Sequence, residues 1–241
     1  MLMGPQNLPE RLDLVRKRIE KAAGQAQRPV DSVTLLGVTK GVAPEALVEA
    51  AAAGVCDFGE SYLQEALQKI AAVKAPQQLT WHFIGRLQSN KTRPVAEAFA
   101  WVHAVDRLKI AERLSEQRPY YAPPLNVCLQ VNVAAEDSKG GVSFAELPAL
   151  AASVAALPRL KLRGLMCLPP DEEDPQKQRF WFRRLRQALE QLTRNGLQLD
   201  TLSMGMSGDL EAAVLEGATI VRVGTALFGP RERHAADAAP A

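Results

Sequence analysis

The sequence predicts a single (β/α)8 TIM barrel with one additional helix at its N-terminus. Eight short runs rich in apolar and β-branched residues alternate with longer stretches of helical periodicity, a pattern typical of repeated βα units and a parallel sheet. The length of 241 residues suits one closed barrel of about 250 residues. An open, doubly wound sheet is the alternative, but no glycine-rich dinucleotide-binding motif follows the first run.

The expected elements follow one another regularly along the chain. An amphipathic helix is expected within residues 1–23. The eight expected strands cover residues 33–39, 55–59, 79–85, 101–105, 125–133, 160–166, 199–204 and 219–224. Helical periodicity covers residues 44–53, 61–73, 108–118, 145–156 and 176–195. Asn195-Gly196 has the composition of a helix C-cap, and a further helix is expected from Leu210.

Composition and charge narrow the class of protein. Hydrophobic residues make up 47% and charged residues 23%, so one full core is expected within residues 1–231, with 232–241 as a disordered tail. A net charge of +2 without a basic block gives no case for nucleic acid. The sequence shows neither a signal peptide nor an apolar run long enough to span a membrane, so we expect a cytoplasmic protein.

The cysteines and histidines predict neither a disulfide framework nor a metal site. Cys56, Cys128 and Cys167 are odd in number, widely spaced and set among apolar residues, which favours reduced thiols in the core. The three histidines lack the spacing of metal ligands, and for His82 a buried histidine with satisfied hydrogen bonds is favoured over a proton shuttle.

Lys40 stands directly after the first expected strand. Alternation places Leu36, Val38 and Lys40 on one face of that strand. Since active sites of this fold lie at the C-terminal ends of the strands, an inward face would place the amine over the mouth of the barrel. Burial there would lower the pKa of the amine and favour Schiff-base chemistry. The alternative is a side chain that extends into solvent.

Two segments with glycine and hydroxyl residues follow the seventh and eighth expected strands. Both are candidate anion sites, because backbone N–H groups at the start of a helix attract anions and a phosphate site at these two loops recurs in the fold. The candidate phosphate ligands are Ser203, Ser207, Gly208, Gly224 and Thr225. A plain N-cap formed by Ser207 with Asp209 explains the first segment equally well. An amine beside a phosphate site indicates a phosphorylated carbonyl ligand, with pyridoxal 5′-phosphate as the leading candidate.

Arg222 and Met166 complete the candidate site. Arg222 shares a face of the eighth strand with Gly224, so an inward face would direct a permanent cation into the pocket. Against a pyridine nitrogen, such a cation would keep the nitrogen unprotonated and weaken the ring as an electron sink. The alternative is an outward arginine bound to Glu211 or Glu216. Met166 ends the sixth strand, where it would contact the ring or simply fill the core.

These segments resemble the pyridoxal phosphate homeostasis protein (YggS/PROSC) family over nearly the whole chain, as far as Arg231. The motifs that carry the resemblance are LLGVTK, FGESYLQEALQK, WHFIGRLQSNKTR, NVAAEDSKGGV, GLMCLPP and LSMGMSGDLEAAVLEGATIVRVGTALFGPR. The resemblance implies a barrel like the N-terminal domain of alanine racemase. It also implies a Schiff base between pyridoxal phosphate and Lys40, phosphate binding by the segments Ser207-Gly208 and Gly224-Thr225, and Arg222 facing the ring nitrogen.

Two positions depart from the family pattern, and Lys139 adds a third charge or polar group near the expected mouth. Ser61 replaces the asparagine that usually follows FGE in the family, and its hydroxyl is shorter than the amide that reaches the ring there. Arg86 replaces a proline after HFIG, and we favour a solvated loop charge over an anion contact. Lys139 lies in a polar loop and is expected to be solvated, with a second amine at the mouth as the alternative.

Three functions remain in competition at this point. The leading interpretation is a carrier that holds pyridoxal phosphate exchangeably and passes it to apoenzymes. Such a carrier would regulate vitamin B6 and amino/keto-acid homeostasis. It predicts a monomer without robust turnover and without catalytic residues. A pyridoxal phosphate enzyme of the alanine racemase type would need a second acid/base group. A phosphate-binding barrel enzyme without the cofactor would need paired carboxylates at strand ends, and the eight runs do not end in any.

Overall fold

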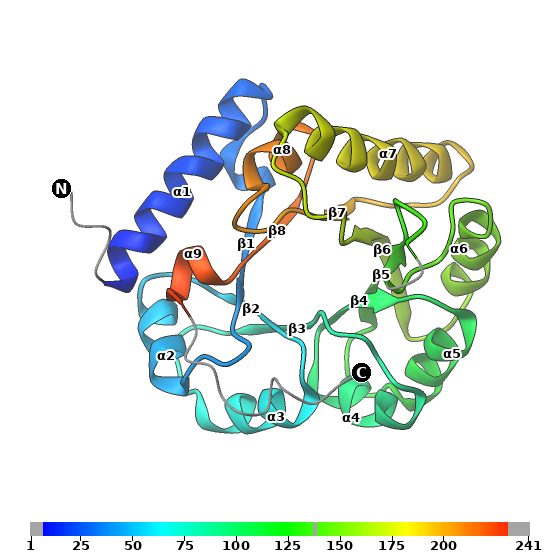
Figure 1. Cartoon of the computed structure of the whole chain (residues 1–241). Coiled ribbons are helices and arrows are strands. Elements are labelled where there is room, and N and C mark those ends of the chain that lie inside the picture. Colours follow the sequence, from blue (N-terminus) through cyan, green and yellow to red (C-terminus); the bar gives the residue numbers. More distant parts are fainter. Residues whose placement is uncertain (1–6, 137–138, 231–241) are drawn as a thin grey trace.

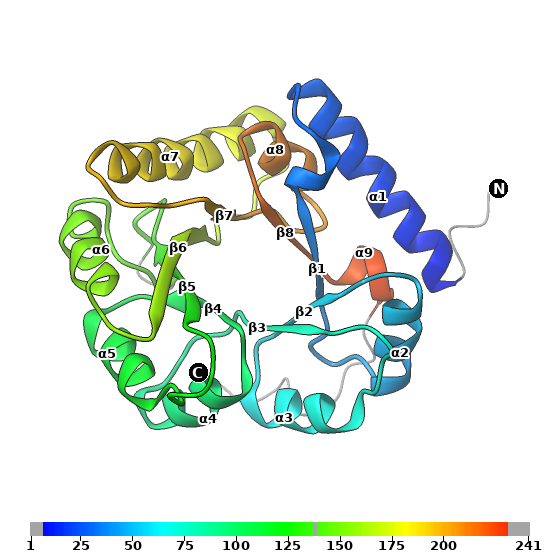
Figure 2. The ribbon, with the colours of Figure 1, turned by 180° about the vertical axis from the view of Figure 1, so that it is seen from behind.

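The predicted barrel is confirmed, and its eight strands close in sequence order. The computed structural model describes residues 7–136 and 139–230. Each strand is parallel to its neighbours in the order β1-β2-β3-β4-β5-β6-β7-β8, and β8 pairs with β1 to close the barrel. Helices surround the strands, as Figure 1 shows from one end and Figure 2 from the other. The closure excludes the open, doubly wound alternative.

The strands are short and the helices alternate with them. The strands are β1 (Thr34–Val38), β2 (Asp57–Glu60), β3 (Thr80–Phe83), β4 (Trp101–Val105), β5 (Leu125–Val131), β6 (Leu160–Cys167), β7 (Thr201–Ser203) and β8 (Ile220–Val223). The helices are α1 (Leu8–Gln25), α2 (Pro44–Ala52), α3 (Leu63–Ala72), α4 (Thr92–Ala98), α5 (Leu108–Gln117), α6 (Leu147–Ala155), α7 (Pro175–Arg194), α8 (Leu210–Leu215) and α9 (Thr225–Phe228). Two 3-10 turns are η1 (Val30–Ser32) and η2 (Ser89–Lys91).

The extra N-terminal helix α1 lies outside the ring, against α8 and α9 (Figure 1). It begins where Asn7 accepts a hydrogen bond from the backbone N–H of Glu10 at 2.9 Å, which caps the first turn. Leu8, Leu12, Val15 and Ile19 recur at helical spacing and are buried. Their burial packs α1 against the side of the barrel where β1 and β8 lie, chiefly through α8 and α9.

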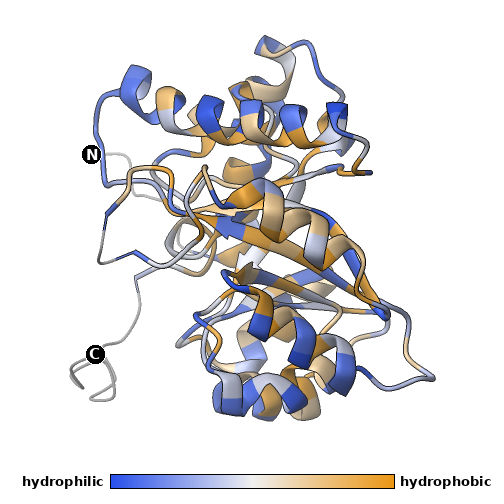
Figure 3. Cartoon of the chain, turned by 90° about the vertical axis from the view of Figure 1, so that its right-hand side faces the viewer, coloured by the Kyte–Doolittle hydropathy of each residue, from blue (hydrophilic) through white to orange (hydrophobic). Residues whose placement is uncertain are grey.

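The core is divided by the sheet into an outer and an inner part. The outer cluster joins the strands to the inward faces of the helices. Hydrophilic and hydrophobic residues alternate along these helices in Figure 3, as expected of amphipathic helices. The inner part is smaller and includes Ala104, Cys128 and Met166, with Trp101 partly buried against them. Polar side chains share this interior, since His103 and Ser203 are fully buried. The inside of the barrel therefore holds a polar network as well as an apolar core.

Close approach of two strands explains one glycine. Gly164 of β6 pairs with Thr201 of β7, and a Cβ at residue 164 would lie 1.8 Å from the Thr201 carbonyl oxygen. Any larger side chain would separate the two strands, so glycine is required there.

The sequence predicted most element bounds to within a few residues. The helix C-cap at Asn195 is confirmed, because Gly196 follows it with φ +98°. Neither α4 nor the short α9 was among the expected helices. The expected tail, residues 232–241, lies outside the described residues. Within the described chain, we find no helix that combines the length and the apolar composition needed for a membrane span.

Candidate functional site

Lys40 lies at the mouth of the barrel, two residues beyond the end of β1. Thr39 turns toward the helix layer, where its hydroxyl donates to Glu60, so alternation leaves Lys40 on the side of the mouth. The side chain is half-buried, and its Nζ lies 4.8 Å from the centre of the Tyr62 ring. Leu36, which was predicted to share a strand face with Lys40, is buried beside Gly59 inside the barrel. This agrees with the predicted inward direction of that face.

A cluster of charged residues holds the turn that carries Lys40. We call Lys69, Glu60 and Glu65 the Lys69 cluster. Lys69 Nζ donates to the Thr39 carbonyl, to Glu60 at 2.7 Å and to Glu65 at 2.5 Å. The Gly41 backbone N–H donates to Glu65 at 2.6 Å. The backbone on both sides of Lys40 is therefore fixed by hydrogen bonds to ionised groups, which are stronger than neutral ones.

Glu60 is fully buried, and burial raises its pKa above the ordinary value, against the hydrogen bonds from Lys69 and Thr39 that lower it. Its second oxygen, Oε2, has no hydrogen-bond partner among the described residues. The cluster was not predicted, although the i,i+4 spacing of Glu65 and Lys69 in the sequence is a signal for an ion pair on one helix.

The two predicted phosphate loops, after β7 and β8, meet next to the turn that carries Lys40. The Ser207 hydroxyl accepts a hydrogen bond from the Ala226 backbone N–H at 3.3 Å, which joins the loop after β7 to α9 after β8. Four backbone N–H groups in these two loops have no acceptor within the described chain. They belong to Ser207, Gly208, Gly224 and Thr225. Two neighbouring loops thus present a set of backbone donors, which is what a phosphate needs.

The alternative role for Ser207 as an N-cap of α8 is wrong. The N-cap position of α8 is Asp209, and no side chain caps it; instead the Asp209 carboxylate accepts the Met206 backbone N–H at 2.5 Å. Burial raises the pKa of Asp209, the largest effect on that group. The carboxylate therefore shapes the loop, and the serine hydroxyl serves the contact with α9.

Arg18 of α1 holds the same loop from outside. Its guanidinium donates to the Ser207 carbonyl at 2.9 Å and to both carboxylate oxygens of Glu211 at 2.6 and 2.7 Å. The bidentate pair fixes the plane of the guanidinium and thereby its direction toward Ser207. This contact could not be predicted from the sequence, since 189 positions separate Arg18 from Ser207.

Arg222 points into the barrel, and the alternative of an outward arginine is wrong. It is 4% exposed and donates to the carbonyls of Ser203 at 2.6 Å and Cys167 at 2.8 Å, and to the Ser203 hydroxyl at 2.9 Å. Burial lowers its pKa, but an arginine remains charged at neutral pH. The two glutamates considered as its partners bind other residues: Glu211 binds Arg18, and Glu216 binds arginines of α7.

The remaining candidate residues take different positions. Met166 is 1% exposed inside the barrel, and Ser61 is half-buried after β2, with its carbonyl so close to Gly85 that a Cβ there would clash. Arg86 is exposed, as expected of a solvated charge. Lys139 is not simply solvated, because its Nζ donates to the Pro169 carbonyl at 2.7 Å and lies 3.3 Å from Glu136.

Cys128 and Cys167 are buried as expected of core thiols, whereas Cys56 is only partly buried. Burial raises the pKa of Cys128 and of Cys167 to about 12, so neither forms a thiolate at neutral pH. Among the described residues, no group of three or more histidine, cysteine, aspartate or glutamate side chains is placed to hold a metal ion.

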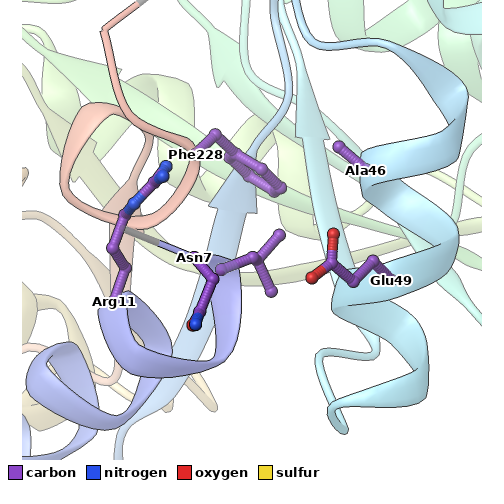
Figure 4. A pocket seen from close by; sticks show the side chains of 6 residues that line it. Asn7, Arg11, Ala46, Glu49 and Phe228 are labelled. Atoms are coloured by element: carbon purple, nitrogen blue, oxygen red, sulfur yellow. The ribbon is translucent and has the colours of Figure 1, made fainter. Parts of the chain in front are cut away.

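One cavity lies apart from the mouth, between α1, α2 and α9 (Figure 4). It measures about 240 Å³, and Asn7, Arg11, Glu49 and Phe228 are among its lining residues. None of the predicted site residues lines it, so it is not the site that the sequence indicated.

Comparisons with known proteins place this geometry in context. Residues 11–232 match the family described as alanine racemase, N-terminal domain. The pyridoxal phosphate homeostasis protein of Pseudomonas aeruginosa is 58% identical over 225 residues, which cover 93% of this chain and 96% of that protein. PipY of Synechococcus elongatus, in a structure with PLP bound, is 38% identical with a TM-score of 0.82, over 92% of this chain and 100% of that chain. Alanine racemase of Corynebacterium glutamicum shares the fold, with a TM-score of 0.69 at 18% identity, over 91% of this chain and 62% of its own.

Proposed function

Because this chain belongs to the pyridoxal phosphate homeostasis protein family, we propose that it binds pyridoxal 5′-phosphate at the mouth of its barrel. Its role is in vitamin B6 and amino/keto-acid homeostasis, as a cytoplasmic monomer that holds the cofactor exchangeably. The observation that carries the proposal is the proximity of Lys40 to the two donor loops. In the β1–β8 pair, Gly37 lies opposite Val223, so Lys40 and Gly224 leave the barrel at the same end.

The residues present fit this ligand part by part. The backbone N–H groups of Ser207, Gly208, Gly224 and Thr225 suit the phosphate dianion. Lys40 suits the aldehyde as the amine that forms the Schiff base, and Met166 suits one face of the ring. When bound, the cofactor supplies an aldehyde for amines and a ring that withdraws electrons.

Arg222 suits the ring nitrogen as a donor that cannot accept a proton. A guanidinium offers only N–H groups, so it binds a ring nitrogen in the unprotonated state. That state weakens electron withdrawal by the ring, which favours storage and exchange of the cofactor over carbanion chemistry. Ser61 lies at the rim. Ser203, expected as a phosphate ligand, is instead buried inside the barrel and joins the set through its hydrogen bond to Arg222.

The direct experiment is covalent trapping on Lys40. Borohydride reduction of the loaded protein should fix the cofactor to the tryptic peptide that contains Lys40, and Lys40→Ala should show no visible absorption band. Lys91→Ala is the matched control, because Lys91 is an exposed lysine on η2 and should leave trapping unchanged. Label found mainly on Lys139 or Lys91 would contradict the assignment.

A further inference from the structure

Five side chains form a continuous series of hydrogen bonds across the inside of the barrel. Arg222 of β8 contacts the Ser203 hydroxyl of β7 at 2.9 Å, and that hydroxyl lies 2.8 Å from His103 Nδ1 of β4. His103 Nε2 lies 2.9 Å from His82 Nδ1 of β3. His82 Nε2 lies 3.0 Å from the Asp57 carboxylate of β2. We call these five residues the interior network.

The two ends of the interior network determine the direction of every hydrogen bond in it. Arg222 can only donate, so the Ser203 oxygen accepts from it and the Ser203 hydroxyl proton is left for His103. Asp57 as a carboxylate can only accept, so His82 donates to it from Nε2. A neutral His82 then has a bare Nδ1, which must accept from His103 Nε2.

The reverse direction leaves a donor without an acceptor. If His103 carried its proton on Nδ1, it would donate to Ser203, whose own hydroxyl would then face a guanidinium that cannot accept. An unsatisfied donor in a fully buried site costs about 1–3 kcal/mol. Both histidines are therefore neutral and carry their protons on Nε2.

We propose that the interior network is a one-way hydrogen-bond network that positions Arg222 toward the ring nitrogen of the bound cofactor. Ser203, His103, His82 and Asp57 are positioning residues in it, while Arg222 alone contacts the cofactor. This inference rests on the function proposed above, and it adds that a carboxylate on β2 takes part in orienting a cation on β8.

Burial explains why such a network is needed. The Arg222 guanidinium lies inside the barrel, held by two backbone carbonyls and one hydroxyl, and no carboxylate of residues 7–136 or 139–230 forms an ion pair with it. A buried charge requires oriented dipoles around it when no counter-ion touches it. The interior network supplies an oriented dipole, because its aligned hydrogen bonds direct the Ser203 lone pairs at Arg222. The series of hydrogen bonds ends on the Asp57 carboxylate.

The first test needs no cofactor. Long-range ¹⁵N–¹H NMR spectra of the histidine rings in the cofactor-free full-length protein report which nitrogen carries the proton. We expect His82 and His103 to be neutral Nε2–H tautomers from pH 6 to pH 8, with His82→Gln and His103→Gln used for assignment. An imidazolium, or a proton on Nδ1 of either ring, would overturn the one-way network.

The second test breaks the network at one atom. Ser203→Ala removes the link between Arg222 and His103, while both carbonyl contacts of Arg222 can remain. We expect the Kd for pyridoxal phosphate to rise roughly three- to tenfold, because one oriented hydrogen bond is lost, and the visible band of the bound cofactor to shift. The same change in His103→Gln would support the network, since the histidine does not contact Arg222 directly.

The matched control is Thr201→Ala on the same strand. Thr201 is also buried, but its hydroxyl binds Asp200 outside the interior network. The Thr201→Ala protein should therefore match the wild type in its affinity for pyridoxal phosphate and in its visible spectrum. Failure of the wild-type protein to bind pyridoxal phosphate would overturn the proposed function. Normal binding by the wild type with an unchanged Ser203→Ala spectrum and affinity would overturn the positioning role alone.

Discussion

Three kinds of group meet at the mouth of the barrel, and each depends on a different physical property. Lys40 depends on the direction of its side chain, which strand alternation sets. The backbone donors of Ser207, Gly208, Gly224 and Thr225 depend on the absence of competing acceptors, none of which is found in the part of the chain that the structure describes. Arg222 depends on burial, because a guanidinium in water would lose its orientation to solvent. The first property can be read from a sequence, whereas the other two depend on contacts in space.

The donor loops predict a selective effect on the phosphate. Ser207→Asp places a negative charge where the phosphate should bind, so affinity for pyridoxal phosphate should fall about tenfold or more. Affinity for unphosphorylated pyridoxal should change little. Ser153→Asp on the exposed face of α6 adds the same charge far from the mouth and should alter neither Kd. Equal losses for both ligands in Ser207→Asp would show that the phosphate binds elsewhere.

Burial of His103 predicts how stability depends on pH. Burial lowers the pKa of His103 well below its ordinary value of 6.5, and the nearby positive charge of Arg222 lowers it further. Below pH 6.5 the unfolded chain therefore binds a proton that the folded protein does not. The free energy of unfolding should therefore decrease as the pH is lowered. The limiting slope is about 1.4 kcal/mol per pH unit for each such histidine.

The comparison that isolates this effect uses His103→Gln. Urea unfolding between pH 6.5 and 5.5 should show a wild-type loss that exceeds the loss in the variant by up to about 1 kcal/mol, because the unfolded-state histidine is only half protonated at pH 6.5. Groups common to both proteins, such as Glu60 with its raised pKa, cancel in this difference. Parallel curves for the two proteins would show that His103 titrates normally in the folded state.

At the scale of elements, the sequence predicted which segments exist better than how they hold the site. Apolar periodicity located all eight strands, because each buries a face and therefore carries a pattern. It placed Lys40 and Gly224 correctly at one end for the same reason. It missed the Lys69 cluster, the Arg18 contact and the interior network, since polar contacts between distant elements leave no periodic signal. The four-residue α9 was missed because a single turn is shorter than the period that would reveal it.

Helix α1 offers a prediction about long-range support of the phosphate loop. Arg18→Gln should loosen Ser207 and leave Glu211 without its bidentate partner, so the Kd for pyridoxal phosphate should rise about threefold or more. Arg16→Gln is the matched control on the same helix, because Arg16 binds the carbonyls of Ala53 and Gly54 instead. Isothermal titration would decide, and equal effects of the two variants would show that α1 acts only through general stability.

The Lys69 cluster offers a prediction about stability. Lys69→Met leaves Glu60 buried without its cation, which should lower the free energy of unfolding by about 3 kcal/mol at pH 8. The loss should be smaller at pH 5, since Glu60 can take up a proton when its pKa is raised by burial. The exposed Lys74→Met should cost little at either pH. Chemical denaturation measures both, and a loss independent of pH would contradict an ionised Glu60.

At the scale of the whole molecule, closing the barrel places residues from both ends of the sequence around one mouth. Pairing of β1 with β8 brings Lys40 beside Gly224, and the sequence could predict that step because eight βα units imply closure. The mouth itself is open: Tyr62 is 50% exposed, and Gly208 and Thr225 are exposed at the donor loops. A ligand bound there stays within reach of water and of amines from other molecules.

This openness, together with Arg222, predicts exchange of the cofactor with little turnover. Water and amines can reach Lys40, so the bond to the cofactor should form and break readily, while a ring nitrogen held unprotonated should stabilise a carbanion poorly. The loaded protein should therefore restore the activity of a pyridoxal phosphate-dependent apoenzyme mixed with it and should not racemise alanine appreciably. Borohydride-reduced protein is the control, because its cofactor cannot leave. Alanine racemisation near the typical enzyme median of about 10 per second would contradict the carrier role, whereas slow exchange of the substrate α-proton would not, since any solvent-accessible Schiff base allows some exchange.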